Sequence, residues 1–327
     1  MFINSMQKGK SHMNYAVIDM GSNSMRLSIY EHTSDQIKKI FSRKEIVGLA
    51  GYISNGMLDA AGIQTACVVI NDFKDDAEKI VDIANIHLFA TAALRNITNR
   101  DEAVTIIKDE TSLTPDVLEG DEEAALGFAG VFKFVNCNNG VMIDIGGAST
   151  ELVLFKDYKI VNLVSLPIGC LNLSLDYVKE VIPSASERKQ IKAAIKEQFD
   201  KVDWGKDAKL PLMVGIGGTL RAASKLSRIL FDLKPEQNEI NACHVKEINK
   251  LLKSHGSNIY HTVSKFIPER LLTISTGVAI LNQAIKKFGT ENVLVSKYGL
   301  REGYLMDRVL KLTSPKSNGS KSGDAAR

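Results

Sequence analysis

Short apolar runs that end at polar turns predict a group of strands at the start of the chain. An apolar run over 14–20 ends at an acidic residue, and after the turn 21–24 apolar and polar positions alternate over 25–31. A third strand is expected over 37–50. Three strands this close in sequence indicate an antiparallel meander that opens a mixed sheet.

Further along the chain, strands alternate with segments of helical periodicity. Helices are expected over 58–84, 101–110, 121–134, 170–180, 184–201, 244–254, 268–287 and 300–312. Strands are expected over 86–94, 115–120, 151–156, 158–166 and 291–296. The segment 211–226 is expected to run from a strand through a glycine-rich turn into a helix. The predicted fold class is α/β.

The pattern of strand, aspartate, glycine turn and two further strands occurs twice. Asp19 closes the first apolar run, and Asp144 closes another run 125 positions later, where the glycine-rich stretch 145–150 follows. An internal repeat implies that the same unit is built twice. We therefore expect two related halves, each a sheet covered by helices, that face one another across a cleft.

The chain has 327 residues, of which 44% are apolar and 24% charged, as in an ordinary globular protein of two domains. Its net charge of +3 comes from the ends, because 1–13 and 314–327 each carry +2 and leave −1 for the body. A near-neutral body argues against a broad nucleic-acid-binding face. It leaves room for a local anion site.

Nothing in the chain predicts membrane insertion or export. The chain has no run of about 18 apolar residues, and its first basic residues are not followed by the apolar core of a signal peptide. The four cysteines form no C-x-x-C pair and stand at positions 67, 137, 170 and 243. We expect a cytoplasmic protein in a reducing compartment, with flexible ends over 1–12 and 314–327.

The first glycine turn has the composition of an anion-binding loop. Glycine lets a backbone approach a ligand closely, and successive N–H groups in such a turn can bind an anion. The candidate phosphate-binding residues here are Gly21, Ser22, Asn23, Ser24 and Arg26. Asp19 could hold a divalent cation. A polar hairpin turn capped by Asp19 gives the same pattern and stays open as an alternative.

The second turn repeats this composition, and the repetition argues against a plain polar hairpin turn. It runs from Asp144 through Gly146, Gly147, Ala148, Ser149 and Thr150 to Glu151. Two such loops facing each other would hold a phosphate chain from both sides, with Asp19 and Asp144 near one shared cation. A third turn, Gly217-Gly218-Thr219, leads into a helix, and backbone N–H groups at a helix start bind phosphate.

Two further segments carry side chains suited to phosphate chemistry. The acidic cluster 119–123 opens a predicted helix, and a carboxylate there could deprotonate an attacking water or simply cap the helix. The spacing does not show which carboxylate points inward. Arg95 follows an apolar strand and could bind a phosphate through two N–H groups or lie on the surface.

The order of these motifs resembles that of the exopolyphosphatase / guanosine pentaphosphate phosphohydrolase (Ppx/GppA) family, in a short, two-domain form. The resemblance covers 14–310 and is carried by DMGSNSMRL, ATAALRN, EGDEEA, DIGGASTE, SLPIGC, GIGGTLRA, PERLLTISTG and SKYGLREG. It implies the actin / sugar kinase / Hsp70 ATPase fold, with two ribonuclease-H-like domains and an interdomain active site. The implied domains are 13–135 with 300–313, and 136–299.

Residue roles follow from the resemblance. Glu122 matches the catalytic base, Arg95 the phosphate-contacting arginine, and Asp144 the aspartate that positions metal and water. The implied metal is Mg²⁺, or Mn²⁺ in its place, with Asp19, Asp144 and Glu151 as candidate ligands. A monovalent cation is left open. The three glycine turns match the phosphate-binding loops of the family.

Two positions depart from the family pattern. Ala148 stands where the family has a third glycine. This exchange costs about 1 kcal/mol if the position needs a positive φ, and nothing if it needs only a small residue. Leu272 stands where the family commonly has an aspartate, which would remove one supporting contact.

We therefore expect metal-assisted hydrolysis of a terminal phosphoanhydride. Inorganic polyphosphate is the preferred substrate, because no sequence feature identifies a guanine pocket. Hydrolysis of pppGpp to ppGpp is the alternative, and a sensor that binds polyphosphate or (p)ppGpp without turnover and an ATP-using kinase are further rivals. No nucleic-acid or membrane partner is expected, and a homodimer is left open.

Overall fold

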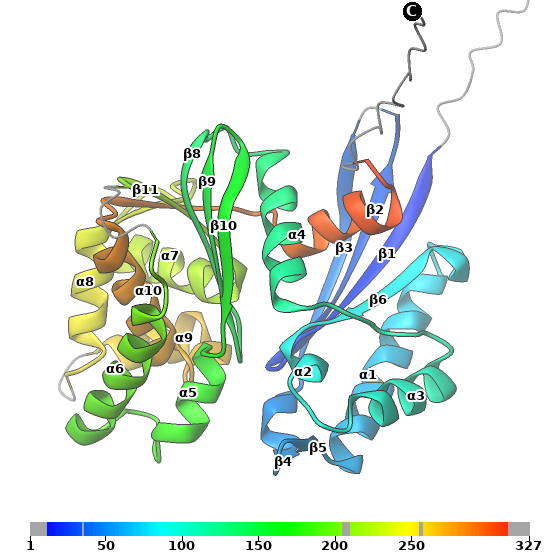
Figure 1. Ribbon diagram of the computed structural model, residues 1–327, viewed down its shortest axis with the longest axis horizontal. Helices are drawn as coiled ribbons and strands as arrows, with labels where there is room; N and C mark the ends of the chain where they lie inside the picture. Colours follow the sequence, from blue (N-terminus) through cyan, green and yellow to red (C-terminus); the bar gives the residue numbers. More distant parts are fainter. Residues whose placement is uncertain (1–11, 35, 205–209, 255–257, 313–327) are drawn as a thin grey trace, which may run out of the picture.

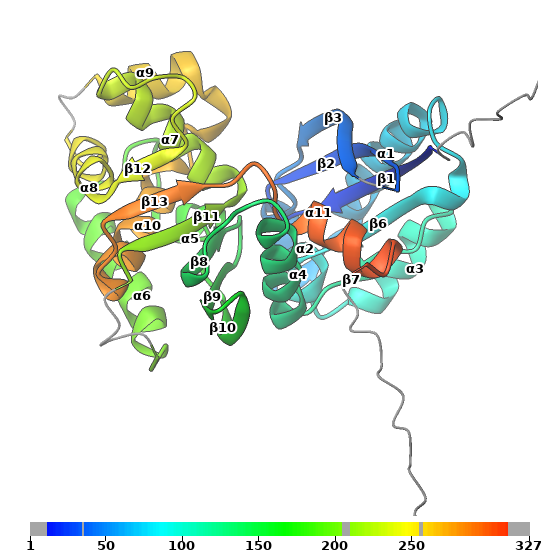
Figure 2. The ribbon, with the colours of Figure 1, turned by 90° about the horizontal axis from the view of Figure 1, so that it is seen from above.

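The computed structural model describes residues 12–34, 36–204, 210–254 and 258–312. The ends predicted to be flexible lie outside these ranges, apart from His12. Two halves lie side by side in Figure 1, and each is built on a sheet with helices packed against it. The helices α4 (Gly120–Phe132) and α11 (Leu300–Tyr304) lie between the two sheets, as the view from above in Figure 2 also shows.

The first sheet has five strands in the order β3-β2-β1-β6-β7. Their bounds are β1 (Met13–Met20), β2 (Ser24–His32), β3 (Ile37–Ile46), β6 (Ile86–Ala90) and β7 (Asp116–Val117). The strands β1, β2 and β3 are antiparallel, whereas β6 and β7 continue the sheet in parallel with β1. The predicted antiparallel meander at the start of a mixed sheet is confirmed.

The second sheet has the order β10-β9-β8-β11-β13-β12. Its strands are β8 (Asn139–Ile145), β9 (Thr150–Lys156), β10 (Lys159–Leu166), β11 (Leu212–Ile216), β12 (Glu239–Asn241) and β13 (Asn292–Val295). Three antiparallel strands again lead into strands parallel to the first, and β12 adds an antiparallel edge. The internal repeat read from the sequence is therefore a repeat of sheet topology.

Helices cover the outer face of each sheet. In the first half these are α1 (Ala60–Glu78), α2 (Ala92–Arg95) and α3 (Arg100–Thr111). In the second half they are α5 (Cys170–Tyr177), α6 (Ala185–Asp200), α7 (Gly217–Leu230), α8 (Ala242–Leu251), α9 (Ile259–Phe266) and α10 (Ile274–Phe288). Shorter elements are the hairpin β4 (Ile53–Ser54) and β5 (Met57–Leu58), the 3₁₀ turns η1 (Leu49–Tyr52), η2 (Ile83–Asn85) and η3 (Pro268–Arg270), and the π-helical turn η4 (Leu305–Val309).

Several predicted boundaries were wrong. The strand expected over 37–50 ends at Ile46, and the strand expected over 115–120 covers only Asp116–Val117. The helix expected over 58–84 ends at Glu78, because the chain turns there toward β6 and Ile80 lies on the surface. The strand expected over 86–94 ends at Ala90, where α2 follows. The helix expected over 268–287 begins only at Ile274, because Pro268–Arg270 form a separate 3₁₀ turn.

Alternation along the first strand of each half decides which side chains face the partner half. Ile18 points into the core beneath α1, whereas Val17 packs against Tyr304 of α11 on the opposite face. In the second half, Met142 likewise packs against Ala124 of α4. Side chains two positions apart share one face of a strand. The aspartates two positions after Val17 and Met142 therefore both lie on the inner faces.

The two central helices approach each other unusually closely. A Cβ atom added at Gly130 of α4 would lie 1.9 Å from the carbonyl oxygen of Gly299, and one added at Gly303 of α11 would lie 1.8 Å from that of Leu126. Only glycine fits at these two crossings. Within the described parts of the chain, the helices are all too short or too polar to span a membrane.

Candidate active site

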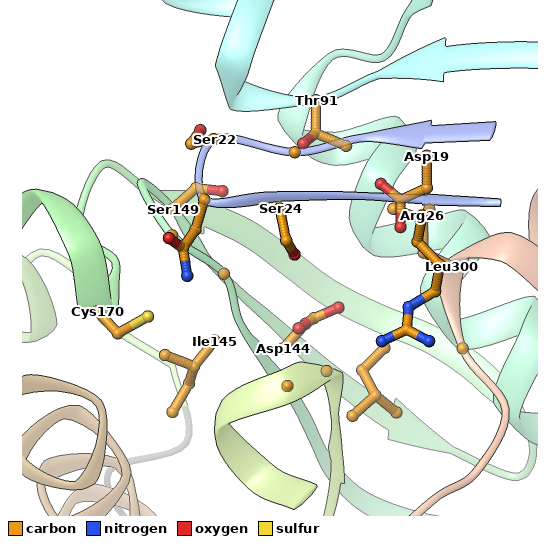
Figure 3. A pocket seen from close by; sticks show the side chains of 18 of the residues that line it. Asp19, Ser22, Ser24, Arg26, Thr91, Asp144, Ile145, Ser149, Cys170 and Leu300 are labelled. Atoms are coloured by element: carbon orange, nitrogen blue, oxygen red, sulfur yellow. The ribbon is translucent and has the colours of Figure 1, made fainter. Parts of the chain in front are cut away.

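The glycine turns that follow β1 and β8 face each other across a pocket between the two halves (Figure 3). A Cβ atom added at Gly147 would lie 3.3 Å from both the Cβ atom and the backbone nitrogen of Asn23. The two turns therefore lie close to each other, with little more room between them than one methyl group would fill. This places the two loops on opposite walls of one site, as the repeat predicts.

Strand register sets the charge of each wall. Asp19 is paired with Arg26 across β1 and β2, and Arg26 is paired with Lys44 across β2 and β3. At the matching position of the repeat, Asp144 is paired with Glu151 across β8 and β9. Directly paired residues share one face of an antiparallel sheet. The first half therefore presents an aspartate beside two cations, and the second presents two carboxylates side by side.

The third glycine turn supports Asp144 directly. Gly217 has φ +84°, and a Cβ atom there would lie 2.2 Å from Oδ1 of Asp144. The guanidinium of Arg270 lies over Gly218, because a Cβ atom added at Gly218 would be 1.8 Å from Arg270 Nη2. The turn therefore makes room for a carboxylate on one side and a guanidinium on the other.

Most of the predicted phosphate-binding residues line the pocket. These are Gly21, Ser22, Asn23, Ser24, Arg26, Gly146, Gly147, Ala148, Ser149, Gly217 and Gly218, together with Asp19 and Asp144. Thr150 and Thr219 are buried instead, because their hydroxyl groups donate to the carbonyls of Ile168 at 2.6 Å and Ile145 at 3.0 Å. These two threonines fix the loops and do not face the pocket.

The two departures from the family pattern have little consequence in the structure. Ala148 is not among the residues with positive φ, so its methyl group introduces no backbone strain. The side chain of Leu272 is 58% exposed, and its carbonyl accepts a hydrogen bond from Ser174 Oγ at 2.7 Å.

Glu122, predicted to be the catalytic base, does not line the pocket in the structure. Glu122 is the third residue of α4, and its carboxylate turns back to accept a hydrogen bond from the Glu119 N–H at 3.0 Å. Its other oxygen pairs with Arg308. The hydrogen bond from Glu119, with a smaller contribution from Arg308, holds the pKa of Glu122 below its usual value. Glu122 thus caps a helix at the surface.

The next residue, Glu123, lines the pocket and is only 8% exposed. Burial, followed by the negative charge of Glu151, raises the pKa of Glu123 well above its usual value. Arg95 Nη1 donates to Glu123 Oε2 at 2.7 Å and to the Leu118 carbonyl at 3.0 Å. Arg95 does not line the pocket. It therefore holds Glu123 in place, and its predicted contact with phosphate stays a prediction.

The three predicted metal ligands do not gather around one point. Among the residues that the structure describes, no three His, Cys, Asp or Glu side chains are close enough to hold an ion together. The carboxylate of Asp19 accepts a hydrogen bond from Arg301 at 3.0 Å. Glu151 is buried and accepts a hydrogen bond from Ser165 Oγ at 2.8 Å. Among the described residues, Asp144 is the predicted ligand whose carboxylate lies in the pocket without a hydrogen bond to a cationic side chain.

Burial affects the carboxylates of the second half strongly. It raises the pKa of Asp144 to about 6, a shift that the positive charge of Arg221 partly offsets. Burial and the charge of Asp144 together raise the pKa of Glu151 to about 7. Glu151 Oε2 is buried without a hydrogen-bond partner in the described structure. Desolvation disfavours the charged form of a carboxylate, so added positive charge would stabilise this wall.

Sequence reasoning missed most of the cations around the pocket. Six cationic side chains line it against the three carboxylates Asp19, Glu123 and Asp144, namely Arg26, Lys44, Arg221, Arg270, Lys297 and Arg301. Burial, followed by the charges of Arg301 and Arg26, lowers the pKa of Arg221 to about 10. A buried excess of positive charge favours a polyanionic ligand. Of the five missed residues, Lys44 lies in no motif. Arg221, Arg270, Lys297 and Arg301 lie in the family motifs quoted above, where the sequence analysis gave them no role.

The model of the Ppx/GppA phosphatase family matches residues 28–312, which is most of the chain. The chain belongs to the Ppx/GppA phosphatase family. It is 28% identical over 318 residues to a bifunctional 3-dehydroquinate synthase/phosphatase of Fusobacterium nucleatum, covering 93% of this chain and 48% of that protein. It is 27% identical over 321 residues to a guanosine-5'-triphosphate,3'-diphosphate pyrophosphatase of Vibrio cholerae, covering 94% of this chain and 61% of that protein.

Solved structures agree with this Ppx/GppA assignment. The Aquifex aeolicus family member superposes with a TM-score of 0.74 at 25% identity, covering 93% of this chain and all of that one. An exopolyphosphatase from Cytophaga hutchinsonii gives a TM-score of 0.79 at 22% identity, covering 90% of this chain and 97% of that one, and shows the fold alone. The chain spans only about half to three fifths of the length of the two curated relatives.

Proposed function

We propose that this Ppx/GppA protein hydrolyses the terminal phosphoanhydride bond of a linear polyphosphate. The observation that carries the proposal is the close approach of the two glycine turns at Gly147 and Asn23, with Glu123 on the wall of the same pocket. Facing loops of this kind can bind both sides of a phosphate group. The surplus of cations accounts for a substrate with several negative charges.

The residues of the pocket divide the reaction between them. Backbone N–H groups of the glycine turns and the arginine side chains bind the terminal phosphate oxygens and stabilise the charge that develops on them. Glu123 accepts a proton from a water molecule whose oxygen attacks the terminal phosphorus in line. The bond between that phosphorus and the bridging oxygen breaks, and the shortened chain leaves with the electron pair. Arg95 keeps Glu123 oriented through its 2.7 Å hydrogen bond.

The donor set fits a magnesium ion held partly by substrate. Mg²⁺ usually takes one or two protein carboxylates and completes its shell with water and phosphate oxygens. Asp144 offers a carboxylate in the pocket, and the buried, unpartnered Oε2 of Glu151 lies on the same wall. When bound, Mg²⁺ or Mn²⁺ would offset the negative charge of the phosphates. Asp144 would hold the ion, with Asp19 available only if it released Arg301.

Phosphate release tests the proposal directly. Wild-type protein is incubated with tripolyphosphate, longer polyphosphates and ATP in the presence of Mg²⁺, and orthophosphate is measured over time. Release of one orthophosphate at a time from the polyphosphates, with little from ATP, is expected. Tight binding without release would instead support a sensor. Transfer of phosphate from ATP to a second molecule would support a kinase.

A second candidate, hydrolysis of pppGpp, is favoured by an aromatic pair at the edge of the pocket. Tyr298 lines the pocket and is 36% exposed, and its ring is stacked on that of Phe134 at 3.7 Å between centroids. An exposed aromatic ring beside a phosphate site can stack on a nucleobase. If pppGpp is a substrate, Tyr298→Ala should raise its KM while that of tripolyphosphate stays the same. Equal KM values for pppGpp in both proteins would contradict this use of Tyr298.

A further inference from the structure

We infer that Glu302 is a positioning residue that holds one wall of the pocket in the form that binds phosphate. The inference rests on the proposed function. The chain leaves the second sheet at Val295 and returns to the first half at α11, and the connecting residues 297–301 line the pocket. Glu302 follows this segment directly and is 2% exposed.

Three donors converge on the Glu302 carboxylate. Oε1 accepts hydrogen bonds from the Tyr30 hydroxyl at 2.8 Å and from Lys39 Nζ at 3.0 Å, and Oε2 accepts one from the Gly299 N–H at 2.9 Å. Tyr30 lies on β2 and Lys39 on β3. One buried carboxylate therefore fastens the connecting segment to two strands of the first sheet.

The charge of Glu302 also acts on Arg301. Burial alone would raise the pKa of Glu302, but the positive charges of Arg301 and Lys39 outweigh it and keep the group ionised. Arg301 donates from Nη1 to Asp19 at 3.0 Å, and its buried Nε has no acceptor among the described residues. Arg301 is thus held between the charges of Asp19 and Glu302, with donor capacity left over. Fixing a guanidinium in advance lowers the ordering cost when phosphate binds.

The anchor can be weakened without touching the pocket. Tyr30 and Lys39 do not line the pocket, and the Lys39 side chain is 34% exposed on an edge strand. Removing the Lys39 ammonium should therefore loosen the wall while leaving the fold and Glu123 intact. The neighbouring Lys38 has no hydrogen bond to Glu302 and provides a matched control on the same strand.

The test compares Lys39→Met, Glu302→Gln and the control Lys38→Met with wild type, using tripolyphosphate as the probe. Calorimetry without Mg²⁺ gives Kd, and phosphate release with Mg²⁺ gives KM and kcat. Lys39→Met should raise Kd and KM by about tenfold, and Glu302→Gln by more, because charged hydrogen bonds are lost. The kcat values should stay within about twofold. Lys38→Met should behave as wild type.

A double-mutant cycle separates positioning from a merely structural role. If Lys39 acts through Glu302 on Arg301, adding Lys39→Met to Arg301→Met should raise Kd little beyond Arg301→Met alone. Additive effects, or an unchanged Kd in folded Lys39→Met and Glu302→Gln, would overturn the inference. Absence of tripolyphosphate binding by wild type would overturn both the inference and the proposed function. Normal wild-type turnover with unaffected variants would overturn the inference alone.

Discussion

Gly217 leaves the space that the carboxylate of Asp144 occupies, since a Cβ atom there would lie 2.2 Å from Asp144 Oδ1. Gly217→Ala should therefore displace Asp144 and strain a backbone whose φ is +84°. We expect kcat/KM for tripolyphosphate to fall by at least about tenfold, as for other displaced active-site groups. Gly51→Ala is the control, because a Cβ atom there meets nothing within 4 Å. Equal activity in both variants would show that the position of Asp144 does not matter.

The crossing of α4 and α11 should be intolerant of any side chain. A Cβ atom at Gly303 would lie 1.8 Å from the backbone oxygen of Leu126, which cannot move as a side chain can. Gly303→Ala should lower the free energy of unfolding in urea by about 1–3 kcal/mol, the usual cost of overpacking. Unchanged stability would mean that the two helices can separate at little cost.

The dependence of activity on alkaline pH should report on Lys44. Burial, followed by the positive charges of Arg270 and Arg26, lowers the pKa of Lys44 to about 8. As the pH rises through this value Lys44 loses its charge and binds the polyanion less well, so kcat/KM should fall. The value of kcat should fall less, because bound phosphate favours the charged form of Lys44.

Lys44→Arg provides the control for this assignment. Arginine stays charged throughout the range, so the alkaline fall in kcat/KM centred near the pKa of Lys44 should disappear from the variant. The measurement is the pH profile of kcat/KM for both proteins. The same alkaline fall in Lys44→Arg and wild type would contradict the role of Lys44.

The parts of the site that repeat were predictable from the sequence, because they depend on local order. An apolar strand that ends at Asp19 or Asp144 and runs into a glycine turn positions both residues with little help from the rest of the chain. Topology then brings the turns together. By contrast, Lys44, Arg221 and Arg301 reach the pocket from elements far apart in sequence. Lys44 has no motif near it, and the motifs that contain Arg221 and Arg301 do not show which side chain reaches the pocket.

The sequence analysis chose Glu122 as the catalytic base, whereas the structure places Glu123 in the pocket. The spacing of residues at the start of α4 contains a signal that separates the two. A glutamate three positions after a helix N-cap commonly turns back to the N-cap N–H. With Glu119 as the N-cap, Glu122 occupies that position and Glu123 faces inward. The role of Arg95 could not be found in this way, because its partner Glu123 is 28 positions away.

Comparison of Glu123→Gln with Glu122→Gln tests the central claim most directly. Both variants replace one carboxylate in the same turn of α4, so differences in fold and charge are small. Turnover of tripolyphosphate should fall by about 10²–10⁴-fold in Glu123→Gln, the usual contribution of a general base. Glu122→Gln should stay within about threefold of wild type and lose about 1 kcal/mol of stability at most. Full activity in Glu123→Gln together with loss in Glu122→Gln would contradict the account.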